Sequence, residues 1–248
     1  MENKYEFTDE VINTPSGRVL HRIRALRDFG NVEKGDLGGF IEWKSNLSHE
    51  GNCWVYGDSK VFGAAKVSGN AHVENSSIYD AAKISGDAFV TSSVIFGESM
   101  VYNNAYIEDS IIYGSCKICN RAHVIKSNIS DEAKILGRTC VKDSSVYEKA
   151  RVDGWFGILN LRLGGNSTVN SKDDYIAIDG GNYDITFART TDNNIFVSYF
   201  GYSDIIRFEG NLYNEFIDLI NSPRISDKKV KTELLKLMEL VKIRFNRS

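Results

Sequence analysis

Histidine is the first candidate for catalytic chemistry, because its imidazole takes up or releases a proton near neutral pH. His72 and His123 occupy the same position of a repeated pattern, three repeats apart. If one repeat advances the chain by about 4.8 Å, as neighbouring strands do, the two rings lie about 14 Å apart. They cannot act as a pair within one chain, so we interpret each as a surface residue, with a catalytic role as the alternative.

Cysteine chemistry is not favoured by the spacing. Cys116 and Cys119 form a C-x-x-C element, but the repeat directs their side chains to opposite sides, which is unsuited to shared metal ligation. With Cys53 and Cys140 they are too few for a disulfide scaffold, and they fit a reducing compartment as free thiols. The glycine-rich segment 35–39 lacks the Gly-Lys-Ser/Thr of a phosphate-binding loop. We predict no metal site and no cofactor.

A basic column recurs one residue before an aliphatic position of the repeat. Its members are Lys66, Lys83, Lys117, Lys134 and Arg151, with Met100 as the one interruption. Like charges on neighbouring strands repel, so the column predicts an anionic partner, either an acidic protein surface or a phosphate-bearing molecule. The alternative is a solvated sheet face whose flexible lysine stems splay the charges apart. Arg22 and Arg24 mark a second candidate anion site near the N-terminus.

An aromatic column follows another aliphatic position. It consists of Phe62, Tyr79, Phe96, Tyr113 and Tyr147, with Ser130 in between. A row of exposed aromatic side chains is typical of a protein interface, so we predict an interface between copies of this chain. The alternative is an aromatic ladder that only stabilises the stack.

Both columns depend on a 17-residue repeat. Aliphatic residues recur in steps of six, six and five, and all eighteen positions from Val61 to Ile158 are Val or Ile. These β-branched residues suit an extended backbone. Three short strands per repeat, each with one inward side chain, predict a triangular coil and therefore a mainly β fold, a parallel β-helix.

The corners of the coil have their own residues. Gly, Asn or Asp fill eleven of the twelve positions that lie two residues after the first and second aliphatic residues of each repeat. These three types best tolerate a left-handed backbone. A serine column predicts a hydroxyl ladder that satisfies backbone groups at the third corner; it consists of Ser76, Ser93, Ser110, Ser127 and Ser144.

Units such as Val61–Lys66 and Ile84–Phe89 resemble the hexapeptide repeat of left-handed β-helix proteins. The segments 20–26, 35–42 and 46–52 resemble a family of uncharacterised bacterial and phage or prophage proteins of this type. The resemblance implies a left-handed β-helix and a phage context. Hexapeptide acyltransferases, which share this coil, are commonly trimers and typically use a histidine at a subunit junction. A loop often interrupts their coils beside it, and none interrupts residues 61–158 here.

The flanking segments predict caps for the two open ends. Residues 1–54 form an N-terminal hairpin, with strands at 4–12 and 18–26, followed by an irregular capping segment. The β-helix extends over 55–175, with Tyr175 continuing the 17-residue spacing. Residues 176–248 form a small β unit with two helices, the last beginning after Ser226.

Composition excludes some functions. The chain has 30 Lys and Arg against 33 Asp and Glu, a net charge of −3, which argues against a globally basic nucleic-acid binder. No run of about 18 apolar residues predicts a membrane span. The N-terminus is polar and acidic, unlike a secretory signal. We therefore predict a cytoplasmic protein, in the host bacterial cytoplasm if it is phage encoded.

Long outward columns without a catalytic constellation favour a non-catalytic binding protein. We predict that it is phage or prophage encoded and inhibits or sequesters a host factor, such as a bacterial defence component. Its partner is a host protein or an anionic ligand, and the chain forms a dimer or trimer. Two alternatives remain, an acyltransferase-like enzyme of the hexapeptide-repeat type and a sponge for a small signalling nucleotide. Measurable acetyl transfer distinguishes the first, and nucleotide released on denaturation distinguishes the second.

Overall fold

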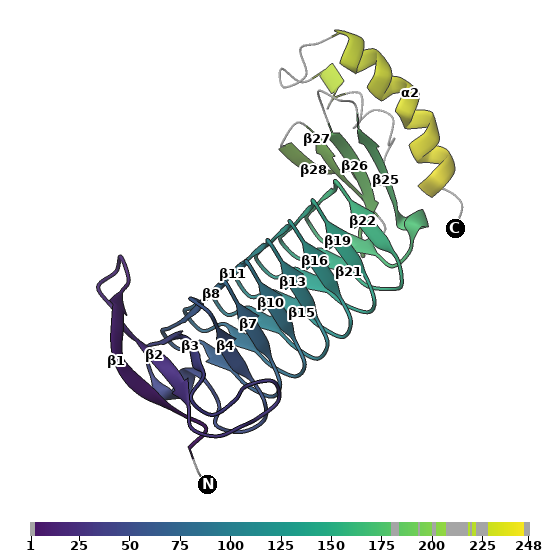
Figure 1. Ribbon diagram of the computed structural model, residues 1–248. Coiled ribbons are helices and arrows are strands. Elements are labelled where there is room, and N and C mark those ends of the chain that lie inside the picture. The colour runs from purple at the N-terminus through teal and green to yellow at the C-terminus, as the bar shows by residue number, and fades with distance from the viewer. Residues whose placement is uncertain are drawn as a thin grey trace.

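A stack of triangular coils forms the long axis of the molecule, with an N-terminal hairpin at one end and a small sheet with a helix at the other (Figure 1). This computed structural model describes residues 3–179, 184–192, 194–199, 202–206, 218, 220–221 and 228–245. The predicted mainly β fold with 17-residue coils is confirmed. No helix of the described part is long and apolar enough to cross a membrane.

Three sheets form the sides of the coil stack. The first face contains β5 (Lys60–Val61), β8 (Ser77–Ile78), β11 (Val94–Ile95), β14 (Ile111–Ile112), β17 (Asn128–Ile129), β20 (Ser145–Val146) and β23 (Arg162–Leu163). The second contains β6 (Lys66–Val67), β9 (Lys83–Ile84), β12 (Met100–Val101), β15 (Lys117–Ile118), β18 (Lys134–Ile135), β21 (Arg151–Val152) and β24 (Thr168–Val169). The third contains β4 (Trp54–Tyr56), β7 (His72–Glu74), β10 (Phe89–Thr91), β13 (Tyr106–Glu108), β16 (His123–Ile125), β19 (Cys140–Lys142) and β22 (Gly157–Leu159).

The coil register places like residues on top of each other. Each short strand pairs in parallel with the strand 17 residues further on, as Ile95 does with Ile112. All eighteen Val and Ile positions of the repeat are buried. The corner residues Asp80, Asn103, Asn120 and Asp131 have φ between 57° and 64°, so the left-handed corners are also confirmed.

The N-terminal segment contains a coil that the sequence pattern did not reveal. The hairpin of β1 (Tyr5–Asn13) and β2 (Val19–Ala25) continues into β3 (Leu37–Ile41) and η1 (Lys44–Asn46). Ile41, Leu47 and Val55 pair with Val61, Val67 and Val73, at offsets of 20, 20 and 18 residues. The segment 28–54, predicted to be irregular, therefore forms most of one coil, and its longer turns hide it from a 17-residue pattern.

The C-terminal end is closed by an antiparallel sheet of β25 (Tyr175–Asp179), β26 (Asp184–Arg189), β27 (Ile195–Tyr199) and β28 (Tyr202–Ile206). The short helix η2 (Lys172–Asp174) leads into it. Tyr175 begins this sheet and does not continue the coil, whose last strand ends at Val169. Helix α2 (Lys228–Phe245) buries Val241 and Phe245. Of the two predicted helices, the last corresponds to α2, and Ser226 before it lies outside the described residues.

The serine column forms the predicted hydroxyl ladder at the third corner. Ser110 Oγ donates to the carbonyl oxygen of Glu108 at 2.7 Å and accepts the amide of Ser127 at 3.1 Å. The same pattern repeats at Ser76, Ser93, Ser127 and Ser144. Each hydroxyl thus joins two successive coils at a buried position.

Replacing Ser110 by alanine should lower the free energy of unfolding by about 1–3 kcal/mol, because the buried Ser127 amide loses its acceptor. Chemical denaturation measures the change. Ser85→Ala is the control, since Ser85 is an outward, half-buried residue of the second face. Equal stability of the two variants would mean that the ladder contributes nothing specific.

Candidate functional site

The third face carries a ladder of five rings that we did not predict. His72, Phe89, Tyr106 and His123 begin successive strands in register, and Tyr56 adds a ring from β4. Their ring centroids are separated by 4.0 Å (Tyr56–His72), 4.2 Å (His72–Phe89), 5.5 Å (Phe89–Tyr106) and 5.4 Å (Tyr106–His123). The imidazole of His72 is therefore held between the rings of Tyr56 and Phe89, which restricts its rotation. The third face is turned toward the viewer in Figure 1.

A carboxylate completes the site at His72. Its Nε2 atom lies 3.3 Å from Oε2 of Glu74, the other outward residue of β7. A carboxylate only accepts hydrogen bonds, so the neutral imidazole carries its proton on Nε2 and keeps a lone pair on Nδ1. Burial lowers the pKa of His72, and Glu74 opposes that shift. His72 is consequently unprotonated at neutral pH, in the state that a general base requires.

The remaining histidines have different surroundings. His123 is exposed, its ring is tilted by 37° against Tyr106, and its imidazole makes no hydrogen bond or ion pair with any described residue. His21 stacks on Phe7, and His49 stacks on Tyr5. These last two rings belong to the packing of the N-terminal cap, so His72 is the histidine with a partner suited to catalysis.

The basic column lies along the second face as its spacing predicts. Lys66 pairs with Lys83, and Lys134 pairs with both Lys117 and Arg151, in parallel strands. All four lysines are exposed, and none has a carboxylate within ion-pair distance in the described part of the chain. Arg151 pairs with Asp153. The binding role of the column stays a prediction.

The aromatic column divides into two parts. Phe62, Tyr79, Phe96 and Tyr113 stack on the first face, half-buried, with centroid distances of 5.0, 4.9 and 5.3 Å. Tyr147 instead meets Phe196 of β27 edge-on at 6.2 Å. Its ring belongs to the contact with the C-terminal sheet. An interface role for the four stacked rings stays a prediction.

The two hairpin arginines already have anionic partners within the chain. Arg22 Nε lies 2.7 Å from Glu10 Oε2, and Arg22 Nη2 lies 3.0 Å from Asp58 Oδ1. Arg24 pairs with Glu6. An external anion would have to compete with these carboxylates for both side chains.

Three of the four cysteines are buried, which does not suit nucleophilic chemistry. All four are free thiols, and Cys53, Cys116 and Cys119 are buried. Burial raises the pKa of Cys116 to about 12, which keeps its thiol protonated and unreactive.

Comparison with known proteins shows what the coil region is similar to. Residues 45–136 match the family model described as GlmU-like, C-terminal hexapeptide. The uncharacterized acetyltransferase YdcK of Escherichia coli (strain K12) is 35% identical over 78 residues, which cover 31% of this chain and 24% of that protein. The match thus spans about a quarter of that relative's length. The left-handed hexapeptide β-helix is confirmed as the type of the coil.

These similarities contradict the prediction of a non-catalytic protein that sequesters a host factor. Both the hexapeptide family and the acetyltransferase relative favour the acyltransferase alternative instead, and neither points to a phage. The sequence pattern compares equivalent positions of the repeat, so it did not pair His72 with a carboxylate. The carboxylate partner of His72 stands two residues away on the same strand, where the period of two places both side chains on one face.

Proposed function

We propose that this chain is an acyltransferase of the hexapeptide-repeat type. It would move an acyl group, in the first instance acetyl, from a thioester to a nucleophilic acceptor. The support is the family match over residues 45–136, which include His72, Glu74 and His123, together with the acetyltransferase relative. The observation that carries the proposal is the His72–Glu74 pair, held between Tyr56 and Phe89.

In the proposed reaction, His72 acts as the general base. As the acceptor oxygen or nitrogen attacks the thioester carbonyl, its proton passes to Nδ1 of His72. The bond between the carbonyl carbon and sulfur then breaks, and the leaving thiolate takes the proton from the imidazolium. Glu74 stabilises the imidazolium between these two steps, because its carboxylate faces Nε2.

The proposed active unit is a dimer or trimer in a reducing compartment such as the cytoplasm. His72 lies on an open sheet face, with 27% of its side chain exposed, so a second copy would provide the wall that excludes water from the reaction. In the proposed unit, the stacked rings of the first face of one copy lie against the third face of the next copy, which carries His72. Four free thiols suit a reducing compartment.

The basic column remains the proposed contact for an anionic partner.

Release of free thiol from acetyl-coenzyme A tests the function directly. We expect the purified chain to release thiol faster in the presence of at least one alcohol, amine or amino sugar from an acceptor panel. Mass spectrometry should find the corresponding acetylated product. Thiol release that no acceptor stimulates, from acetyl, succinyl and longer acyl donors alike, would contradict the proposal.

A further inference from the structure

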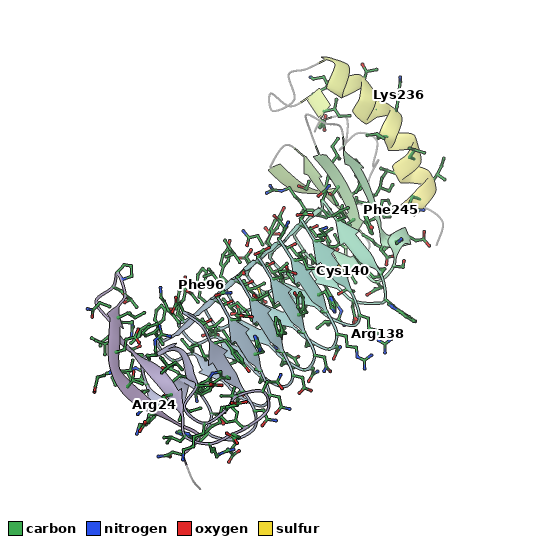
Figure 2. All side chains as sticks on the ribbon, in the orientation of Figure 1. Arg24, Phe96, Arg138, Cys140, Lys236 and Phe245 are labelled. Atoms are coloured by element: carbon green, nitrogen blue, oxygen red, sulfur yellow. The ribbon has the colours of Figure 1, made fainter. Side chains whose placement is uncertain are left out.

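A groove of about 490 Å³ lies at the corner between the second and third faces, and its lining includes Asp87, Asn104, Arg121 and Arg138. The outermost side chains of this corner, one per coil, are Asn70, Asp87, Asn104, Arg121, Arg138 and Trp155. Figure 2 shows Arg138 at this edge of the stack, with its side chain directed outward. We call these six residues the second-corner row.

The first half of the second-corner row satisfies its own polar groups. Asn70 Nδ2 donates to Asp87 Oδ1 at 2.8 Å, and Asn104 Nδ2 lies 3.5 Å from Asp87 Oδ2. The carboxylate of Asp87 is therefore bound by two amides and is not paired with an arginine. Asp87 is the one charged residue of this half of the row.

The second half contains two cations without a counterion. Arg121 and Arg138 are exposed and follow each other on adjacent coils, about 4.8 Å apart along the backbone. Neither has a carboxylate within ion-pair distance among the described residues, whereas Arg18, Arg22, Arg24, Arg151 and Arg244 each do. Like charges on neighbouring strands repel each other, and a bound anion reduces that repulsion. Arginine is also the residue that binds phosphate in a planar, bidentate manner.

Trp155 adds an aromatic surface at the end of the arginine pair. It is 82% exposed, and the guanidinium carbon of Arg138 lies 5.3 Å from its ring centroid. Arg138 covers one side of the indole, which leaves the other side open to solvent. An exposed indole of this kind is a stacking surface for a planar ring, such as a nucleobase.

We propose that Arg121, Arg138 and Trp155 form a binding site for a nucleoside phosphate. The two guanidinium groups bind the phosphate, and the open side of the indole stacks on the base. Inorganic phosphate would leave the indole unused, and a neutral sugar would leave both arginines uncompensated. The site goes beyond the proposed function, because binding there requires no acyl transfer. The nucleotide is either free or the nucleotide part of a thioester carrier, and these two sources share the same chemistry.

Isothermal titration calorimetry of the full chain with ADP, coenzyme A and pantetheine tests the site. We expect ADP or coenzyme A to bind, and pantetheine, which lacks the nucleotide, not to bind. The double variant Arg121→Ala/Arg138→Ala and the single variant Trp155→Ala should each weaken binding tenfold or more. The matched controls are Lys149→Ala, an exposed cation between β20 and β21 that lies outside the basic column, and Trp43→Ala, a tryptophan 58% exposed in the N-terminal cap. Both controls should bind as the wild type does.

The two sources of nucleotide give different results. Equal affinity for ADP and coenzyme A indicates a free nucleotide, and affinity at least tenfold higher for coenzyme A indicates a carrier. Binding that survives in the double variant, or that neither probe shows, would overturn the site. Acetyl transfer by a wild type that binds neither probe at this corner would remove the site and leave the proposed function. Nucleotide binding without any acyl transfer would keep the site and remove the proposed function.

Discussion

Replacing His72 by phenylalanine should lower kcat/KM for acyl transfer about a hundredfold or more, while the melting temperature stays close to that of the wild type. The phenyl ring preserves the stack between Tyr56 and Phe89, so the third face keeps its packing. The substitution removes the only group at this position that accepts a proton. General base catalysis is typically worth about 10²–10⁴ in rate, which sets the expected loss. Initial rates of thiol release measure it.

Two further variants separate the role of His72 from a general effect on the ladder. Glu74→Gln keeps the size of the side chain but removes the charge that stabilises the imidazolium, so a smaller loss is expected. His123→Phe is the matched control, because His123 occupies the same position of the repeat three coils further on. We expect His123→Phe to keep the rate of the wild type. If His123→Phe abolished transfer and His72→Phe did not, the assignment of His72 as the base would be wrong.

Replacing Ile112 by alanine should destabilise the β-helix by about 2–5 kcal/mol, the range typical of a large-to-small change in a packed core. Ile112 is fully buried and stacks between Ile95 and Ile129 in the middle of the coil stack. Its neighbour Ile111 points the other way and is 47% exposed. Ile111→Ala is the control, because the two variants have the same amino-acid composition. A surface substitution of this kind changes the free energy of unfolding by no more than about 0.5 kcal/mol.

Equilibrium unfolding in urea, followed by circular dichroism, measures both isoleucine variants. The coil assignment predicts a large loss for position 112 and almost none for position 111. Similar losses at both positions would place both side chains in comparable surroundings. That result would contradict the assignment of inward and outward side chains, on which every column of the repeat depends.

The coil stack was predictable because the residue types that define it recur at a fixed period in the sequence. A single aliphatic position repeated at six, six and five residues defines the strands, the inward direction and the outward columns together. The coil of Ile41, Leu47 and Val55 was not predictable in this way, because its turns are longer. Its register follows from backbone pairing with the next coil, which the spacing of residues does not contain.

The candidate site was only partly predictable. The sequence placed His72 and His123 in one outward column and the lysines in another, and the structure agrees. The pair of His72 and Glu74 lies across one strand, and a comparison of equivalent positions between repeats does not detect it. The ion pair of Arg22 with Glu10 depends on an irregular hairpin register between Phe7 and Val11, which no sequence pattern marked.

The pH dependence of acyl transfer tests the central claim most directly, namely that a neutral histidine on the third face is the base. Burial lowers the pKa of His72, so its imidazole loses its proton below the ordinary value for histidine. We predict that kcat/KM rises with pH through that lowered pKa and is level at neutral pH, and that the rise disappears in His72→Phe. The same rising limb in wild type and His72→Phe, at comparable rates, would contradict the account.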